Sequence, residues 1–250
     1  MNGLKIYGEN FVTEFCTITP VSGAATQDYL FDQNQDTKWA SDGSSDIIEE
    51  SLDITFKNWQ GEEVNRTFDR LVILNHNLKA ITADYYDGAA WVSIPEATLT
   101  LASGYTIIEL AAPVTAGRVR INCLTTQVAN EEKSIGELKV CLAVLEEPAW
   151  RSNFPRRDSM RGGDYRLAGG PLVAWKEWTK VSGTLSLENI ALASLDAILP
   201  YMKQAAPMTV VFWEDFDPAE VYEFLVVNAP QIQIDRKMRL FSASLSLEEK

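Results

Sequence analysis

Oxygen-bearing side chains that can ligate a metal ion gather in one short segment, LFDQNQDTKW, residues 30–39. Carboxylates and a hydroxyl on one tight loop supply hard oxygen ligands, and such ligands suit Ca²⁺, which takes about six to eight of them. The alternative is that Asp32 and Asp36 only cap turns through side-chain-to-backbone hydrogen bonds, as Asp commonly does. The segment is therefore a candidate metal site with a purely structural alternative.

Aromatic side chains in the same half of the chain offer a second kind of chemistry. Trp39, Trp59, Tyr85, Tyr86 and Trp91 could stack on a sugar ring while nearby Asp or Asn side chains hold its hydroxyl groups. Large aromatic residues are more often buried than ligand-binding. Among the five, we take Trp59 and Tyr85 as the candidate carbohydrate-binding residues.

Catalytic motifs are absent from the sequence. It contains no GxSxG, HExxH, GxxxxGK[ST] or GxGxxG. His76 is the only histidine, which excludes sites that need several histidines from one chain, and we expect it to be a locally bonded turn residue. The acidic run Trp213–Asp217 could pair carboxylates as a glycosidase does, but with Pro218 it favours an acidic turn. We expect no enzyme.

Composition sets further bounds. The chain of 250 residues is 46% hydrophobic and 23% charged, so it can bury one large core or two ordinary ones. Its net charge of −13 disfavours nucleic acid as a partner. The cysteines Cys16, Cys123 and Cys141 form no CxxC pair and are expected to be buried thiols. We expect neither a membrane-spanning helix nor a cleaved secretory leader.

Charge is unevenly distributed along the chain. Residues 1–150 carry 10 basic and 22 acidic side chains, whereas residues 151–250 carry 12 and 13. Prolines and glycines interrupt regular structure just after the change. We therefore predict three parts: a first domain over residues 1–148, a basic connecting arm over 149–171 and a second domain over 172–250. The arm holds five arginines, which suit contacts with an acidic neighbouring subunit, although a solvated linker is the alternative: Arg151, Arg156, Arg157, Arg161 and Arg166.

The first domain reads as a β-sandwich. Between residues 50 and 145, short runs such as SLDITF, RLVILNHNL, YTIIEL and RVRINCL alternate apolar and polar residues, which is typical of half-buried strands. Asp87-Gly88 predicts a hairpin turn, because Gly tolerates the positive φ of a tight turn. The fold class that we predict is mainly β.

The same segments resemble discoidin-type, galactose-binding-like domains. The spacing in Asp32 to Trp39 resembles their D-x-x-x-x-T-x-W loop, the run 68–78 with its NHNL ending resembles versions from bacteriophage virions, and residues 135–140 resemble the closing strand. The resemblance covers about residues 10–145. It implies a jelly-roll β-sandwich whose core holds Trp39 and Trp91. It also implies a structural calcium ion at Asp32, Asp36, Thr37 and Glu137, although Gln33 stands where the family usually has Gly.

The second domain reads as a small β-barrel or sandwich with one helix. Residues 172–179 and 181–187 predict two strands around Ser182-Gly183, and residues 190–205 carry the apolar stripe of an amphipathic helix interrupted by Pro200. Strands follow to the end of the chain. This order resembles the tail-tube-like domain of long-tailed phages, which is also found in distal tail proteins and baseplate hubs.

Together the two resemblances imply a structural virion protein at or near the tail tip or baseplate. Such a protein would assemble in the host cytoplasm and form a ring of its own copies through the second domain. Its other partners would be tail and baseplate proteins and host surface glycans. The alternative is a carbohydrate-binding module of a cell-surface or secreted system.

Overall fold

A computed structural model describes most of the chain in two compact units. The first, residues 9–143, is called here the sandwich unit, and the second, residues 1–8 and 144–250, the ribbon unit. The described residues are 4–34, 37–43, 45–46, 48–100, 104–147, 152–153, 156–166, 172–204, 207–212, 220–228, 231–235 and 240–249.

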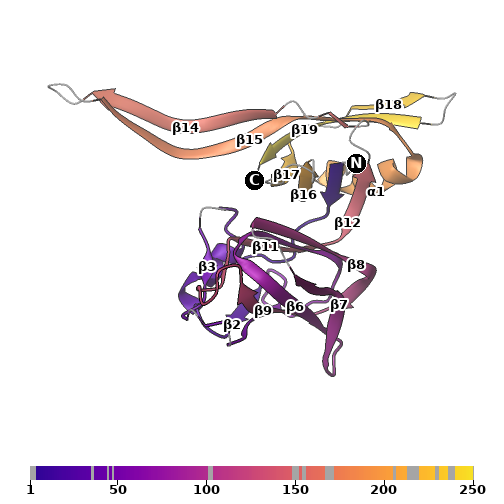
Figure 1. Cartoon of the computed structure of the whole chain (residues 1–250). Coiled ribbons are helices and arrows are strands. Elements are labelled where there is room, and N and C mark those ends of the chain that lie inside the picture. The colour runs from indigo at the N-terminus through magenta and orange to yellow at the C-terminus, as the bar shows by residue number, and fades with distance from the viewer. Residues whose placement is uncertain are drawn as a thin grey trace. The chain divides into compact units, whose positions relative to one another are not determined.

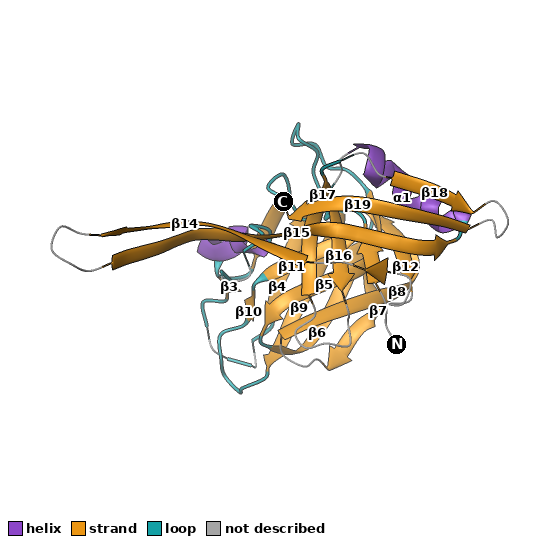
Figure 2. Ribbon diagram, turned by 90° about the horizontal axis from the view of Figure 1, so that it is seen from above, coloured by secondary structure: helices purple, strands orange, loops and turns teal. Residues whose placement is uncertain are grey.

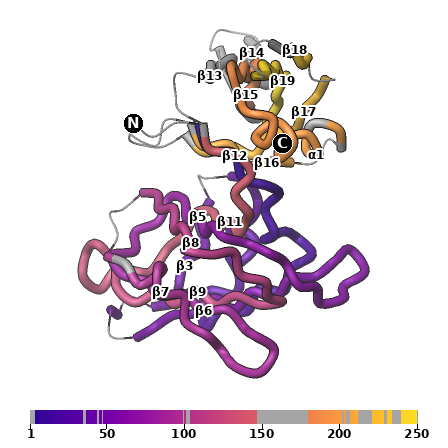
Figure 3. Tube along the Cα trace, turned by 90° about the vertical axis from the view of Figure 1, so that its right-hand side faces the viewer, coloured from indigo at the N-terminus to yellow at the C-terminus, as the bar shows by residue number. Residues whose placement is uncertain are grey.

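The sandwich unit consists of two antiparallel sheets. The larger has the strand order β2-β4-β9-β6-β7, the smaller has the order β11-β5-β8, and the two-residue strands β3 and β10 pair beside them. Figure 3 shows β5, β8 and β11 on one side of the unit and β6, β7 and β9 on the other. The bounds are β2 Thr17–Pro20, β3 Trp39–Ala40, β4 Glu50–Thr55, β5 Arg66–His76, β6 Leu78–Tyr86, β7 Trp91–Thr100, β8 Gly104–Ala116, β9 Arg118–Thr126, β10 Ser134–Ile135 and β11 Glu137–Cys141, with a 3₁₀ helix η1 at Ala24–Leu30.

Side chains from both sheets form one core between them. Leu52, Ile121 and Ile81 of the larger sheet and Phe68 and Leu138 of the smaller sheet are all fully buried in the same cluster. These residues alternate with polar ones along their strands, because successive side chains of a strand point to opposite faces. The prediction of a β-sandwich is confirmed.

The ribbon unit is one antiparallel sheet with a helix packed against it (Figure 1). Leu195 and Ile198 of α1 are buried in one cluster with Leu185 and Leu245 of the sheet. The predicted helix is confirmed, and Pro200 lies within it. The bounds are β1 Leu4–Tyr7, β12 Ala143–Glu147, β13 Ser152–Asn153, β14 Arg156–Arg166, β15 Leu172–Ile190, α1 Leu192–Gln204, β16 Met208–Phe212, β17 Glu220–Val226, β18 Gln231–Asp235 and β19 Leu240–Glu249.

The division of the chain differs from the three predicted parts. The sandwich unit is inserted between β1 and β12, which are neighbouring strands of the ribbon unit's sheet, so residues 1–8 and 144–148 lie in the second unit. The segment 149–171 is not a connecting arm, because β13 and β14 within it pair with β15. The predicted turn at Ser182-Gly183 is also wrong, since β15 runs unbroken through both residues.

β14 and the first half of β15 form a two-stranded ribbon. Residues 172–183 of β15 pair with β14, whereas β19 pairs with β15 only from Ser182 onward. Over residues 172–181, β15 therefore has one strand partner among the described residues. Figure 2 shows the ribbon extending far from the rest of its sheet.

Two further expectations concern membranes and cysteines. None of the helices in the described residues is long and apolar enough to span a membrane. Cys123 and Cys141 are buried thiols, as expected, whereas Cys16 is half-buried and its Sγ lies 2.9 Å from the carbonyl oxygen of Phe11. Burial raises the pKa of the Cys123 thiol to about 12, so this cysteine stays protonated and unreactive in the folded protein.

Candidate functional site

The outward face of the five-stranded sheet carries a continuous set of polar and aromatic side chains. They occupy the positions between the core residues of β4, β9, β6 and β7, and the strand registers place them side by side. We call this set the polar face: Asp53, Thr82, Asp84, Tyr86, Trp91, Arg118, Arg120 and Asn122. It brings together residues from four strands that lie far apart in the sequence.

Arg120 is the centre of the polar face. Its Nε and Nη2 donate to the two carboxylate oxygens of Asp53, with an Nη2–Oδ2 distance of 2.7 Å, and its guanidinium stacks 4.2 Å from the centre of the Trp91 ring. The hydrogen bond to Asp53 raises the pKa of Arg120. Bidentate bonds and stacking hold a guanidinium rigidly, so the donors that Arg120 does not use keep a fixed direction.

Arg118 repeats this arrangement beside Arg120. Its Nε and Nη2 donate to Glu63 at 3.1 and 2.7 Å, and its guanidinium lies 5.4 Å from the centre of the Tyr86 ring. The hydrogen bond from Arg118 lowers the pKa of Glu63. Tyr86 in turn contacts Trp91 edge to face, with ring centres 5.5 Å apart. The two arginines and two aromatic rings therefore form one supported layer.

Glu63 ends a tight turn that presents Trp59. The turn is closed by the bridge between Lys57 and Glu63, and the Asn58 side chain accepts hydrogen bonds from the backbone N–H groups of Gln60 and Glu62. Trp59 is 76% exposed at its tip. An indole held at the end of a rigid, hydrogen-bonded turn offers a flat apolar surface at low entropic cost.

Asn122 and Asp84 form the polar end of the face. The Asn122 Nδ2 donates to Thr82 Oγ1 at 3.0 Å and to Asp84 Oδ2 at 2.9 Å. Asn122 is 7% exposed, and its side-chain hydrogen bonds to described residues are both donated by Nδ2, which leaves its carbonyl oxygen open to a ligand. The Oδ1 atom of Asp84 is likewise open within the described part of the chain, and Asp84 has no cation there at ion-pair distance.

The polar face can bind a ligand rich in hydroxyl groups. It combines directed N–H donors on Arg120 with open acceptors on Asn122 and Asp84. Neighbouring hydroxyl groups of a sugar need this mixture of donors and acceptors. The face holds no histidine, cysteine or lysine.

The sequence predictions at this surface have mixed outcomes. Trp59 is highly exposed, as a stacking residue must be, whereas Tyr85 is half-buried and packs against the core. Tyr86, the next residue, is the one on the polar face. Trp39 is fully buried, as predicted, but Trp91 supports Arg120 on the outer surface and does not fill the core.

Six residues of the polar face are not among the predicted site residues: Asp53, Thr82, Asp84, Arg118, Arg120 and Asn122. The alternation in SLDIT, TADYY and RVRIN carries their signal, because it places these side chains on one face of neighbouring strands.

The predicted calcium loop is partly described. The Thr37 Oγ1 lies 2.7 Å from both Asp32 Oδ2 and the carbonyl oxygen of Asn34, although one hydroxyl proton can fully serve only one acceptor. The Asp32 Oδ1 accepts from the backbone N–H of Asn34 at 2.9 Å, which is the turn cap of the structural alternative. Glu137 is ion-paired with Lys139 at 3.1 Å, and Asp36 lies outside the described residues. The calcium site stays a prediction, because no three carboxylate, histidine or cysteine groups cluster within the residues described here.

Calcium should raise the thermal stability of the intact protein if this loop binds it. A ligand that binds only the folded state stabilises that state by about 2.7 kcal/mol at a concentration of 100 times its Kd. We expect a higher melting temperature in calcium than in chelator, and loss of the difference in Asp32→Asn. Asp87→Asn is the control, because Asp87 also caps a turn, at Ala89 and Ala90, away from the loop. A melting temperature that is the same in calcium and in chelator would contradict the prediction of a calcium site.

The remaining predicted site residues lie mainly in the ribbon unit. Arg156, Arg157, Arg161 and Arg166 are positions of β14, and the structure does not describe their side chains. Arg151 and the acidic run 213–217 lie outside the described residues. The role of these arginines as subunit contacts stays a prediction.

His76 ends β5 and is held by two hydrogen bonds. Its Nδ1 accepts from the backbone N–H of Leu78 at 3.2 Å, so the neutral ring carries its proton on Nε2 and donates to Thr106 Oγ1 at 3.0 Å. Burial lowers the pKa of His76 to about 4. The expected local bond is present at Leu78, but His76 is the last residue of a strand and its second bond reaches Thr106 of β8.

Folding stability should fall as the pH drops through the titration of His76. The unfolded state binds a proton near pH 6.5 and the folded state only near pH 4, so stability is lost as the pH decreases between these values. The loss is about 3 kcal/mol. Urea unfolding at several pH values should show a smaller loss in His76→Asn, whose Oδ1 can still accept from Leu78. An identical pH dependence in both proteins would contradict this assignment.

Comparison with known proteins finds similarity only at the level of structure. No protein-family model and no curated protein sequence matches the chain. A family 32 carbohydrate-binding module of Clostridium perfringens NanJ, solved in complex with galactose, is 17% identical with a TM-score of 0.44, and the match covers 53% of this chain and 98% of that one.

Two further solved structures are similar over a comparable share of the chain. Chitosan-binding module 1 of a Paenibacillus chitosanase/glucanase is 21% identical with a TM-score of 0.42, covering 52% of this chain and 97% of the module. A Ruminococcus gnavus GH29 fucosidase in complex with fucose is 16% identical with a TM-score of 0.42, covering 54% of this chain and 26% of that one. For a fucosidase-related protein of Bacteroides thetaiotaomicron, the match covers 30% of that chain. These likenesses concern the fold.

Proposed function

We propose that the sandwich unit binds carbohydrate, with the polar face as its hydrogen-bonding surface and Trp59 as a stacking residue at its edge. The observation that carries this proposal is the open hydrogen-bonding capacity around Arg120 and Asn122. Buried or rigid polar groups that lack partners gain more from a ligand than flexible ones, because little entropy is lost when the ligand binds.

Different side chains of the surface would make different kinds of contact with a sugar ring. Arg120 donates from the N–H groups that Asp53 does not use, and Asn122 and Asp84 accept from hydroxyl groups. The Trp91 ring already carries the Arg120 guanidinium, so it supports the donor and leaves stacking to Trp59. This proposal concerns binding alone.

Titration calorimetry with neutral mono- and oligosaccharides tests the proposal. The panel should include galactose, fucose and N-acetylglucosamine oligomers. We expect saturable binding that weakens about tenfold or more in Arg120→Leu, since a charge-assisted hydrogen bond contributes about 1.5–3 kcal/mol. Trp59→Ala should weaken binding several-fold, since aromatic contacts contribute about 0.5–1.5 kcal/mol.

The matched control is Arg66→Leu. Arg66 also stacks on an aromatic ring, 5.3 Å from the centre of Phe11, but it is not part of the polar face. Binding should be unchanged in this variant. Absence of binding across the panel, or equal binding in Arg120→Leu and the unmodified protein, would contradict the proposal.

A second candidate function, a structural virion protein at the tail tip or baseplate, is favoured by the β14–β15 ribbon. An isolated two-stranded ribbon is marginally stable in water, and β15 has one strand partner there among the described residues. Neighbouring copies that covered the ribbon would stabilise it. Heterologous contacts give a ring where the rotation between copies closes, and we propose that copies assemble in this way through the ribbon unit in the virion tail.

Light scattering after size-exclusion chromatography tests this assembly. We expect a closed oligomer that becomes a monomer when the ribbon is shortened by joining residue 158 to residue 181 through a two-residue turn. The sandwich unit should remain folded in this variant, since the ribbon lies in the other unit. A monomer at every concentration of the unmodified protein would contradict assembly.

A further inference from the structure

We propose that the polar face selects sugars that carry a free, protonated amino group over neutral and acidic sugars. This inference rests on the proposed carbohydrate-binding function and names its class of ligand. It follows from the balance of charges on the face and from the way its two arginines are already bonded.

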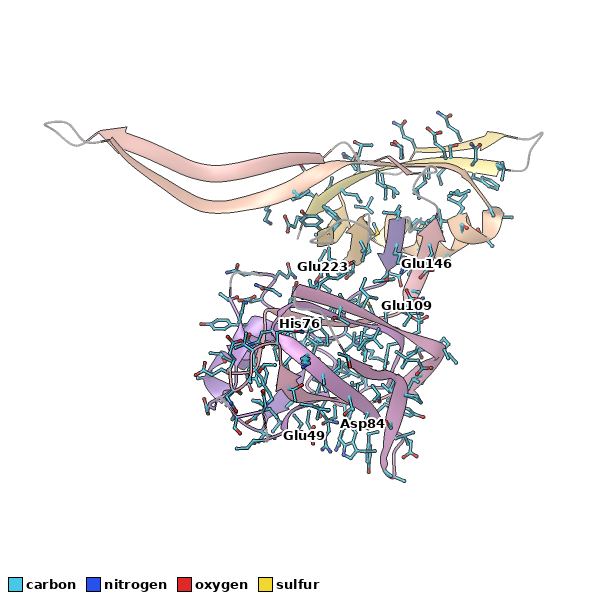
Figure 4. All side chains as sticks on the ribbon, in the orientation of Figure 1. Glu49, His76, Asp84, Glu109, Glu146 and Glu223 are labelled. Atoms are coloured by element: carbon cyan, nitrogen blue, oxygen red, sulfur yellow. The ribbon has the colours of Figure 1, made fainter. Side chains whose placement is uncertain are left out.

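Carboxylates outnumber guanidinium groups around Arg120. Asp53 and Glu63 are each bonded to an arginine, so these two pairs are neutral. Asp84 and the exposed Glu49 also act electrostatically on Arg120, and neither has an ion-pair partner in the described part of the chain. Figure 4 labels both carboxylates in the sandwich unit. Lys57 acts electrostatically on Glu63, so three cations face the four carboxylates and the surroundings of the face keep a net negative charge.

The whole sandwich unit strengthens this preference. Residues 9–143 contain 9 Lys and Arg residues against 20 Asp and Glu residues. A field of this sign attracts cations and repels anions, and the effect decreases with added salt. Asp53 and Glu63 already neutralise the two arginines, so the carboxylate of an acidic sugar gains less from these guanidinium groups than it would from unpaired ones.

Asp84 has the geometry to receive an ammonium group. Its Oδ2 is fixed by the Asn122 amide at 2.9 Å, which leaves Oδ1 for a ligand. The carbonyl oxygen of Asn122, a side chain that is 7% exposed, is the second acceptor that lacks a partner among the described residues. An ammonium group carries three donors and no acceptor, and this end of the face offers acceptors beside an uncompensated charge. Oligomers of glucosamine fit this chemistry.

Calorimetry on the intact protein with three oligosaccharides of equal length tests the inference. The ligands are an oligomer of glucosamine, its fully N-acetylated form and an oligomer of galacturonic acid. At a pH at which the amine is charged, we expect the glucosamine oligomer to bind at least tenfold more tightly than the N-acetylated one, and the acidic one not to bind. The tenfold preference should shrink in high salt and at a pH at which the amine is neutral.

Asp84→Asn should abolish the preference and keep binding of the N-acetylated oligomer, because it removes the charge and retains an acceptor. Glu49→Gln should reduce the preference several-fold, and its exposed position makes misfolding no concern. Asp87→Asn is the control, since this carboxylate caps a turn in the same unit. Equal affinity for the charged and N-acetylated oligomers would overturn the inference and leave the carbohydrate-binding function intact. Failure of all three oligomers and of the neutral panel to bind would overturn both.

Discussion

Replacement of Gly23 by alanine is expected to unfold the sandwich unit or to lower its free energy of unfolding by more than about 4 kcal/mol, which is exceptional for one methyl group. Gly23 has a φ of +69°, and a Cβ atom at this position would lie 1.9 Å from the carbonyl oxygen of Ala40. It would also meet the indole nitrogen of the fully buried Trp39 at 3.0 Å. The backbone of β3 and the core around Trp39 would both have to move.

Gly61→Ala separates the steric clash from backbone strain. Gly61 has a φ of +84°, but nothing lies within 4 Å of a Cβ built on it. The Gly61→Ala substitution should lower the free energy of unfolding by only about 1–2 kcal/mol, which is the strain of a left-handed conformation for an ordinary residue. Urea unfolding of both variants measures the difference. Equal losses in the two would mean that the contact between Gly23 and β3 is not as described.

Asn10→Ala should destabilise the sandwich unit by about 2–4 kcal/mol, because it leaves buried backbone groups without their hydrogen-bond partner. The Asn10 side chain accepts hydrogen bonds from the N–H groups of Val12 and Val140, each at 3.0 Å, and its Nδ2 donates to the Val12 carbonyl at 2.9 Å. Asn10 is 6% exposed. It thus ties the segment that enters the unit to β11, the strand from which the chain leaves it.

Asn58→Ala is the matched control for Asn10. Asn58 also accepts from two backbone N–H groups and donates from its Nδ2, in this case to Glu62, but these bonds face solvent. Water replaces such bonds when they are lost, so the loss of stability should be about 1 kcal/mol. Urea denaturation of the two variants compares them. A smaller loss in Asn10→Ala than in Asn58→Ala would contradict the role of Asn10.

The sandwich was predictable because its signals are local. Alternation in runs such as SLDITF and RVRINCL marks the strands β4 and β9, and Asp87-Gly88 marks the turn between β6 and β7. Each of these features depends on neighbouring residues alone, so the sequence carries it directly. The burial of Trp39 was predicted by the discoidin resemblance.

The ribbon unit was less predictable because its defining features are long-range. The pairing of β1 with β16 joins residues near 6 and 210, and no local pattern reveals that the sandwich is an insertion between two neighbouring strands. The glycines and arginines of residues 156–166 read as a linker because they lack apolar alternation. Pairing with β15, a tertiary feature, makes this segment a strand.

The polar face was missed for a related reason. Asp53 and Arg120 are bonded across two strands that are 67 positions apart, and the partnership of Glu63 with Arg118 spans 55. The sequence marks each residue as outward-facing but does not say which outward-facing residues meet. Aromatic character does not distinguish Tyr85 from Tyr86. Successive side chains of a strand point to opposite faces, so Tyr85 points away from the polar face to which Tyr86 belongs.

Nuclear magnetic resonance of the intact protein tests the central claim, that the polar face binds carbohydrate, most directly. With a saturating oligosaccharide, the indole N–H signals of Trp59 and Trp91 and the Nε–H signal of Arg120 should shift, whereas the indole signal of the buried Trp39 should stay in place. Shifts confined to residues away from the polar face, or no shifts with any sugar of the panel, would contradict the claim.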